Sequence, residues 1–456
     1  MRLNWQGANH PTVFIIVAII IIGILIGQVI AGHSYKFVTA LLLCSIVFIV
    51  TLVNTDAGLA ILIFSMLLSP EIILGHVPGR DIVIRFDDIL LAVITFAWFA
   101  KTSINKGLAL FKRTPLNKAI GVYILVCVIS TMQGAVFGYV IPAKGFFYVI
   151  RYIEYFLLYL LVVNHIHSKK QIKFFVNAFF ITCALVSIYG ILQIPSGERV
   201  SAPFEGAVGE PNTFGGYLLF LFCIATGIFL QNVPQKLKMT LAGLAVLIFV
   251  PFLFTLSRAS YLAIVFSCVT LIILSKKKGI LTTALATIII SVLVLRPEVV
   301  FSRVKYTFQQ KQGRLVKIGN TYLDASSSLR IKSWGESFEA WKKMPLLGRG
   351  ITGYVFIDGQ YIRTLPEMGI VGLIALLWLL WTILKHSLGI YRKMDDELYK
   401  GLALGFIAGF IGLAIHALTA NTFIIIRIME PFWFMAGIVM MLPTLQEEAL
   451  ETQSQQ

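Results

Sequence analysis

The chain has 456 residues, of which 58% are hydrophobic and 13% are charged, and its formal net charge is +16. So little polar surface excludes a soluble globular domain, and many apolar stretches reach the roughly 20 residues that span a bilayer as helix, without the alternating pattern of a β-barrel. Most lysines and arginines lie in short loops between these stretches, so the positive charge indicates membrane topology rather than nucleic-acid binding. All five cysteines lie within apolar stretches without CxxC spacing, which predicts neither a disulfide framework nor a zinc site.

The apolar stretches predict an all-α polytopic membrane protein with about fourteen transmembrane helices. In chain order these helices are expected near 12–31, 37–54, 57–74, 87–101, 118–137, 147–165, 173–193, 212–230, 239–256, 259–275, 280–296, 367–385, 401–418 and 428–444. The first stretch is longer than the core of a signal peptide and has no clear cleavage site, so we interpret it as a helix.

The loops 101–118, 166–173, 231–239, 275–279 and 385–400 hold most of the short-loop lysines and arginines. The positive-inside rule therefore places these loops and both termini in the cytoplasm. The chain then divides into transmembrane helices 1 to 11 in 1–296, a long extracytoplasmic loop in 297–366, helices 12 to 14 in 367–444, and a cytoplasmic acidic tail in 445–456, which is predicted to be disordered.

The long loop contains the sequence DASSSLRIKSWGESFEAWKKMPLLGRG, which predicts an amphipathic helix. Ser327 or Ser328 can cap it, and its aromatic residues recur at i, i+4 and i+7 before Pro345 and the following glycines end it. We expect this helix to lie on the outer surface of the membrane.

Polar residues suited to a chemical role gather on the predicted outer side. They are Arg80, Arg85, Arg151, Arg258, Arg330, Arg349 and Arg427, with Glu210, Asp358 and Glu367. Guanidinium groups stay charged and match phosphate oxygens bidentately, so the cluster suits a pyrophosphate-bearing lipid, whereas snorkelling and interfacial ion pairing are the structural alternative. Arg258 is the most informative, because TLSRAS joins two apolar stretches with almost no loop.

Three further positions have both a structural and a functional interpretation. Arg151 and Glu154 lie one helical turn apart and can neutralise each other. Asn212, in the sequence EPN before the eighth helix, can be a helix cap after the turn made by Pro211. His416 can act as an acid or base or as a buried hydrogen-bonding residue. No P-loop, HExxH, GxSxG or CxxC motif occurs, so an enzyme of this kind would draw on an already activated, lipid-carried substrate.

The order EPN, SR, SSLRIKSWGESFEAWKKMPLLGRG and QYIRTLPEMGIVGL resembles the O-antigen ligase and O-antigen polymerase superfamily, over roughly residues 200–380. The resemblance implies a bacterial membrane glycosyltransferase of the C type that uses undecaprenyl-pyrophosphate-linked sugars at the outer face of the cytoplasmic membrane. No carboxylate cluster with metal-ligand spacing stands out, and we expect no metal and no cofactor. The resemblance also implies that Arg258 and Arg330 bind the pyrophosphate, and we add Arg151. The acceptor hydroxyl would attack the anomeric carbon with inversion while a basic residue takes its proton.

One departure from the family concerns the base. Many members, the ligases especially, have His-Asn before the tyrosine, where this chain has Asp358-Gly359-Gln360-Tyr361. Asp358 can replace the histidine as base or hold an acceptor hydroxyl, and Glu367 matches the family's Glu-x-Gly. We therefore assign catalysis to Arg258, Arg330, Asp358 and Glu367. We assign substrate contacts to Arg80, Glu210, Asn212, Trp334, Arg349, Gln360, Tyr361 and His416.

The aspartate favours a polymerase of lipid-linked repeat units. A ligase that transfers the glycan to lipid A-core or another acceptor, and a transporter or flippase of lipid-linked sugar, are the alternatives. The expected partners are the undecaprenyl-pyrophosphate-linked donor and acceptor, membrane lipids and a chain-length regulator, and no nucleic acid.

Overall fold

The computed structural model describes residues 35–77, 80–104, 112–205, 209–279, 282, 317–318, 321–322 and 325–454. The chain divides into two compact units: residues 1–62 with 86–111, and residues 63–85 with 112–456. We call them unit 1 and unit 2. The predicted helices 12–31 and 280–296 lie outside the described residues, and therefore the count of fourteen stays a prediction.

The described part of unit 1 consists of α2 (Tyr35–Val53), most of α3 (Thr55–Leu68) and α4 (Phe86–Ile104). The rings of Phe48 and Phe96 stack between α2 and α4 with their centroids 5.9 Å apart. Gly58 allows α3 to approach Thr51 of α2, since a Cβ there would come within 2.3 Å of the threonine hydroxyl.

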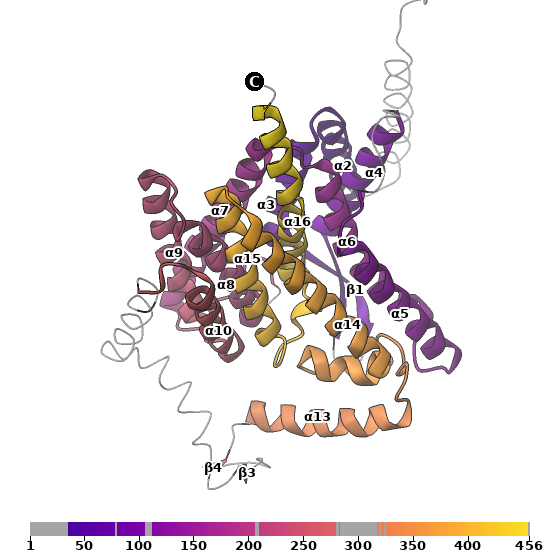
Figure 1. The fold of residues 1–456 in the computed structure, drawn as a ribbon. Helices are drawn as coiled ribbons and strands as arrows, with labels where there is room; N and C mark the ends of the chain where they lie inside the picture. Colours follow the sequence, from indigo (N-terminus) through magenta and orange to yellow (C-terminus); the bar gives the residue numbers. More distant parts are fainter. Residues whose placement is uncertain are drawn as a thin grey trace, which may run out of the picture. The chain divides into compact units, whose positions relative to one another are not determined.

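Unit 2 contains the remaining elements (Figure 1). They are β1 (Glu71–Val77), β2 (Arg80–Arg85), α5 (Asn117–Val136), α6 (Pro142–His165), α7 (Lys169–Gln193), η1 (Ile194–Ser196), α8 (Pro211–Phe229), α9 (Gln235–Phe254), α10 (Arg258–Leu274), β3 (Lys317–Ile318), β4 (Thr321–Tyr322), α13 (Ala325–Lys343), α14 (Gln360–Lys393), α15 (Glu397–His416), η2 (Thr422–Ile424) and α16 (Ile426–Ser454).

Eight helices of the described chain are long and apolar enough to cross a membrane, namely α5 to α9 and α14 to α16. Shorter apolar helices occupy Leu41–Val53, Thr55–Leu68 and Arg258–Leu274. These helices confirm the prediction of a multi-pass α-helical membrane protein. The strands make small exceptions to the all-α prediction: β1 pairs with β2 and β3 with β4, both antiparallel.

Close helix contact through glycine organises the core of unit 2. Added Cβ atoms at Gly227 of α8 and Gly405 of α15 would each come within 2.5 Å of backbone atoms of the facing helix. In lipid the hydrophobic effect does not drive helices together, so their association depends on close packing. Small residues let two helix backbones approach, and the closer contact gives more dispersion energy. Beside this contact, the rings of Phe220, Phe406 and Phe432 pack with centroids 5.3 to 6.0 Å apart.

The structure corrects several predicted boundaries. The helix expected at 57–74 ends at Leu68, because Pro70 cannot continue it and a strand starts at Glu71. The helix expected at 367–385 begins at Gln360 and bends at Gly369, whose φ of 65° is not helical. The tail predicted to be disordered continues α16 through Ser454.

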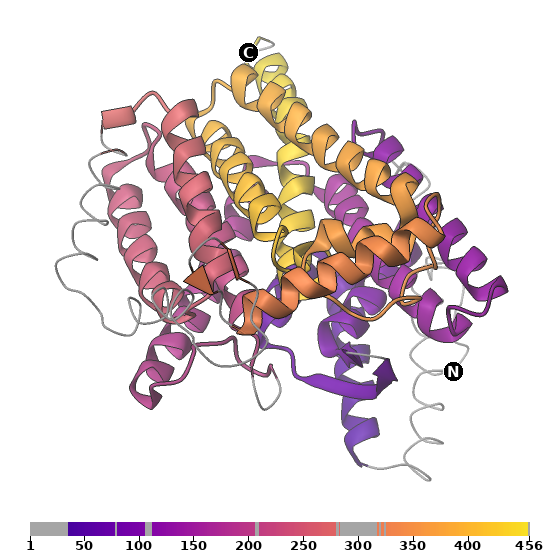
Figure 2. The same ribbon diagram turned by 90° about the horizontal axis from the view of Figure 1, so that it is seen from below.

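The helix α13 lies across the end of unit 2 at which α8, α10, α14 and α16 begin, which we call the site end. Figures 1 and 2 show α13 crossing this end from the side of α10 to the side of α5. The helix starts at Ala325, so Ser327 and Ser328 lie in its first turn and do not precede it as caps. All site residues proposed from the sequence belong to unit 2.

Candidate functional site

The turn between α9 and α10 places Arg258 at the first position of α10. Ser257 caps that helix, since its hydroxyl accepts the backbone N–H of Ser260 at 3.3 Å. Leu256 has a φ of 49°, a strained value for a side chain of this size. Arg199 supports the turn by donating from Nε to the carbonyl of Thr255 at 3.0 Å. Arg258 is half-buried, so a tightly fixed turn presents its guanidinium at the site end.

The EPN sequence meets this turn although 45 residues separate Asn212 from Ser257. The hydroxyl of Ser257 donates to Asn212 Oδ1 at 2.8 Å. Asn212 is therefore not the predicted cap: α8 begins at Pro211, Glu210 occupies the cap position, and Asn212 lies in the first turn. Glu210 is exposed and its Oε2 accepts the hydroxyl of Thr213 at 2.7 Å. The structure thus brings Glu210 and Asn212 to the turn that carries Arg258.

A second group of predicted residues forms where α13 meets the loop before α14. Arg330 donates from Nε to Asp358 Oδ2 at 2.9 Å, and its Nη2 lies 2.9 Å from the same oxygen. Trp334, one turn further along α13, donates from Nε1 to the carbonyl of Asp358 at 2.7 Å. The side chain of Asp358 is 43% exposed and that of Arg330 is 24% exposed. Arg330 and Trp334 therefore both contact Asp358, although the three residues were predicted separately.

The backbone after Asp358 is held by the end of α15. Gly359 has a φ of 104°, a conformation that favours glycine, and a Cβ there would lie 3.3 Å from Trp334 Nε1. The N–H of Gln360 donates to the carbonyls of Ala417 and Ala420. The hydroxyl of Tyr361 donates to the carbonyl of Ala414 at 2.9 Å. Gln360 is buried and Tyr361 half-buried, so these contacts with the end of α15 position the backbone next to Asp358.

His416 is fully buried at the end of α15 and has no exposed surface. Its Nδ1 lies 2.8 Å from the hydroxyl of Thr422, and a Cβ on Gly216 of α8 would lie 3.6 Å from its Cε1. This environment suits the structural interpretation of a buried hydrogen-bonding histidine. The end of α15 connects the two groups of site residues, since it contacts both α8 and the start of α14.

Glu367 lies inside the protein rather than on an open surface. Its side chain pairs with Arg363 Nη2 at 3.0 Å, and the two side chains are 6% and 3% exposed. Its Oε1 also accepts the N–H of Thr352 at 3.3 Å. The bend at Gly369 leaves the carbonyl of Glu367 free to accept the N–H of Gly350 at 2.7 Å. Glu367 thus ties the loop after α13 to α14, an arrangement typical of a positioning residue.

Arg363 was not proposed from the sequence. Its guanidinium lies 4.6 Å from the ring centroid of Phe356. Within the part of the chain that the structure describes, its Nε and Nη1 have no hydrogen-bond partner. The spacing Arg363-x-x-x-Glu367, one helical turn apart, is the signal that could have revealed the pair.

The remaining predicted arginines lie in different surroundings. Arg349 lies over the rings of Tyr139 and Tyr354, with its Cζ 5.2 and 5.6 Å from their centroids. Arg151 is buried in α6, with its Cζ 5.0 Å from the centroid of the Phe147 ring. Arg80 begins β2, and its side chain lies outside the described part of the structure.

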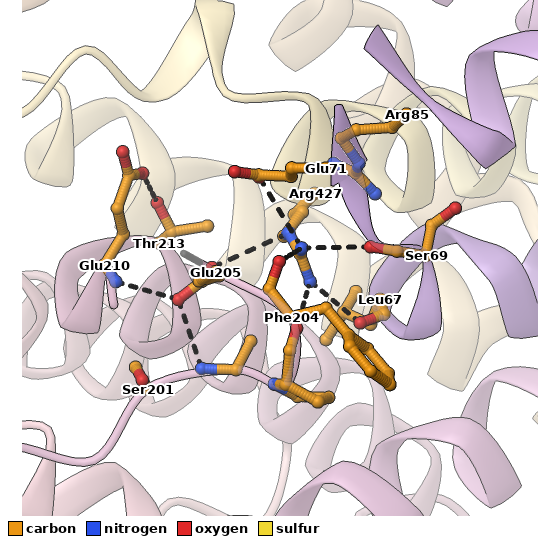
Figure 3. A network of polar contacts seen from close by, with 12 residues as sticks. Leu67, Ser69, Glu71, Arg85, Ser201, Phe204, Glu205, Glu210, Thr213 and Arg427 are labelled. Carbon is orange, nitrogen blue, oxygen red and sulfur yellow. Dashed lines mark hydrogen bonds and ion pairs between the residues drawn. The ribbon is translucent and has the colours of Figure 1, made fainter. Parts of the chain in front are cut away.

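Arg427 makes bonds to several backbone carbonyls at the site end, and Figure 3 shows its surroundings. It is 2% exposed. Nη1 donates to the carbonyls of Leu67 and Pro203, both at 2.8 Å, and Nη2 donates to those of Ser69 at 3.2 Å and Phe204 at 2.9 Å. Arg427 lies at the same end as other arginines predicted from the sequence, but the sequence did not predict its backbone partners.

The structure has many helices that are apolar enough to span a membrane. Arginine and carboxylate side chains gather at the site end, and α13 lies across it. These features define the class as a multi-pass membrane protein with a polar candidate site where helices begin. Residues 242–377 match the family model described as O-Antigen ligase. This match supports the O-antigen ligase and polymerase superfamily and confirms the predicted resemblance. No curated protein matches the chain.

The matched region contains Arg258, Arg330, Asp358 and Glu367, the residues to which the sequence assigned catalysis. Glu210, Asn212, His416 and Arg427 lie outside it. The family supports an enzyme of the O-antigen ligase or polymerase type in general.

Proposed function

We propose that the protein is a glycosyltransferase that polymerises undecaprenyl-pyrophosphate-linked repeat units at the outer face of the bacterial cytoplasmic membrane. The observation that carries the proposal is the contact of Arg330 and Trp334 with Asp358, within the region that matches the O-antigen ligase family. It joins a guanidinium and an exposed carboxylate, which are the groups needed for a phosphate leaving group and a hydroxyl acceptor.

Arg330 can bind phosphate without losing Asp358. One contact of Arg330 with Asp358 uses Nε and the other uses Nη2. The guanidinium has further N–H donors on Nη1 and Nη2. A bound pyrophosphate oxygen would receive these donors, and Arg258 would supply a second guanidinium from the start of α10. Charge that develops on the departing lipid pyrophosphate would be stabilised by both groups.

Asp358 would accept the proton of the attacking hydroxyl or hold that hydroxyl in place. In the described part of the chain Arg330 contacts Oδ2 of the carboxylate, and Oδ1 would bind the acceptor. The aspartate stands where the ligases have histidine, and this favours a lipid-linked acceptor and hence a polymerase. A ligase remains the second candidate, because the matched family is described as O-Antigen ligase.

The donor role of the arginines is tested with purified full-length protein in lipid nanodiscs and a synthetic undecaprenyl-pyrophosphate-linked oligosaccharide. We expect Arg258→Ala and Arg330→Ala to lower transfer by roughly 100-fold or more, the effect of losing a donor to developing charge. Lys332→Ala is the matched control, since Lys332 lies on the same helix, is 69% exposed and pairs only weakly with Glu336 at 3.8 Å. Wild-type transfer by both arginine variants would contradict the assignment.

The same assay separates the two acceptor classes. With the lipid-linked oligosaccharide as the sole substrate, a polymerase makes longer lipid-linked chains, whereas a ligase makes a product only after lipid A-core is added. A flippase moves the lipid-linked sugar across vesicles and forms no glycosidic bond. Longer chains without lipid A-core are the result we expect, and their absence together with a lipid A-core product would favour the ligase.

The proposed orientation puts α13 outside and both termini in the cytoplasm. It is tested in cells with Lys332→Cys, because this position is exposed on α13. A membrane-impermeant maleimide should label the new cysteine in intact spheroplasts. Labelling only after the membrane is opened would reverse the topology.

A further inference from the structure

The segment of residues 199–205, which we call the strap, runs between η1 and the EPN sequence at the site end. Its first residue, Arg199, donates to the carbonyl of Thr255 at 3.0 Å, and the N–H of Val200 donates to the carbonyl of Phe254 at 3.0 Å. Gln193 of α7 bonds both backbone groups of Ser201. This end of the strap therefore supports the turn that carries Arg258.

The other end of the strap is held by Arg427. Figure 3 shows its guanidinium between Phe204 of the strap and the segment from Leu67 to Glu71. It binds two strap carbonyls, those of Pro203 and Phe204, and two carbonyls of the other segment, those of Leu67 and Ser69. Its Nη donors are bound by these four carbonyls and its charge lies near the carboxylates of Glu205 and Glu71, so the buried guanidinium is paired rather than isolated.

Glu205 connects Arg427 to the EPN sequence through its side-chain contacts. Its side chain is 3% exposed, and its Oε1 lies 3.7 Å from Arg427 Nε. Its Oε2 accepts the N–H of Ala202 at 3.2 Å and the N–H of Glu210 at 2.9 Å. The residue after Glu210 begins α8, whose first turn holds Asn212 against Ser257. A continuous series of contacts thus joins Arg427 to the neighbourhood of Arg258.

Backbone strain in the strap is a separate observation. Phe204 has a φ of 60° and a side chain that is 56% exposed, so neither burial nor glycine explains its left-handed backbone. Such a conformation persists where the surroundings over-determine it. Here Arg427 binds the carbonyl of Phe204 and that of the residue before it. The strap is therefore held in one strained shape and does not relax into an ordinary turn.

We infer that Arg427 and Glu205 are positioning residues, which through the strap hold Glu210 and Asn212 in register with Arg258. This inference rests on the proposed function, since the register matters for the donor that Arg258 would bind. A merely structural role would lower the amount of folded protein and leave the kinetics of the folded fraction unchanged. A positioning role lowers kcat or raises KM in protein that is folded.

The test compares Glu205→Ala with Glu205→Gln in full-length protein in nanodiscs. The glutamine keeps an oxygen that can accept the N–H groups of Ala202 and Glu210, whereas the alanine removes it. We expect Glu205→Ala to lower kcat for the synthetic undecaprenyl-pyrophosphate-linked oligosaccharide by roughly 10- to 100-fold, the effect of a displacement near 1 Å. Glu205→Gln should restore most of that loss. Equal kinetics for wild type and Glu205→Ala would overturn the inference.

Hydrogen–deuterium exchange gives a second measurement that needs no substrate. In Glu205→Ala and in Arg427→Lys, the amides of residues 200–205 should exchange at least 10-fold faster, while those of residues 346–352 keep the wild-type rate. Unchanged exchange in the strap would also overturn the inference. If the wild type transfers no sugar but the strap exchanges faster in both variants, the proposed function fails and the positioning network stands.

Discussion

Glu205 makes the stability of the folded protein depend on pH. Its side chain is buried beside Arg427, Glu71 and Glu210, and burial raises the pKa of its carboxyl from 4.5 to about 8, against the opposing attraction of Arg427. The folded protein therefore keeps a proton that the unfolded chain has lost over this interval. The contribution of Glu205 to stability is fully present below about pH 4.5 and is lost as the pH rises to about 8.

Each unit between the two pKa values is worth about 1.36 kcal/mol, so the interval from 4.5 to about 8 corresponds to about 5 kcal/mol of unfolding free energy. Glu205→Gln does not titrate and should lack this loss. The measurement is the free energy of unfolding of both proteins in mixed micelles from pH 5 to 8.5. The difference between the two unfolding free energies removes the contribution of the other titrating groups. As the pH rises, the wild type should become steadily less stable relative to the glutamine variant. A difference that stays constant would refute the reasoning.

Two further predictions concern glycines that permit close backbone contact. Gly405→Ala should lower the free energy of unfolding by about 1–3 kcal/mol, because the new Cβ would lie 2.5 Å from the carbonyl oxygen of Cys223 on α8. Gly243→Ala, where no atom lies within 4 Å, is its control and should not destabilise. Gly369→Ala should cost about 3 kcal/mol or more, since it combines a φ of 65° with a Cβ 2.1 Å from the carbonyl oxygen of Leu346. Gly389→Ala on the same helix meets no atom within 4 Å and is its control. Equal unfolding free energies for a glycine variant and its control would show that the contact does not constrain the backbone.

The apolar stretches predicted most of the helices because a span needs a long run of apolar residues whatever its neighbours are. The same reasoning failed after Leu68, where the apolar residues of β1 continued the run and resembled helix. It also missed the start of α14, because Arg363 and Glu367 interrupt the apolar pattern although they neutralise each other inside the protein. A hydropathy pattern counts each charged residue separately, so it does not show that two charged residues pair inside the protein.

Three residues of the candidate site that the sequence proposed lie in contact, while their roles stay a prediction. Arg330, Trp334 and Asp358 were proposed from the sequence, and the structure joins them across 24 to 28 residues. The backbone contacts of Arg427 and Arg199 were not predicted, because their partners are carbonyls of distant segments, which have no residue type to recognise. The cap role predicted for Asn212 failed for a related reason, since its partner Ser257 belongs to another helix.

These differences change which arginines are candidates for phosphate. Arg427 directs its Nη donors to four carbonyls, so a phosphate could bind there only by displacing them. Each abandoned buried carbonyl would cost about 1–3 kcal/mol. Arg330 instead meets one oxygen of a partly exposed carboxylate and retains donors on Nη1. An exposed ion pair is worth only about 0–1 kcal/mol, so an incoming pyrophosphate can share or replace it. Under the proposed function, the bonds that Arg427 and Arg330 already make therefore favour Arg330 over Arg427 as a ligand of the pyrophosphate.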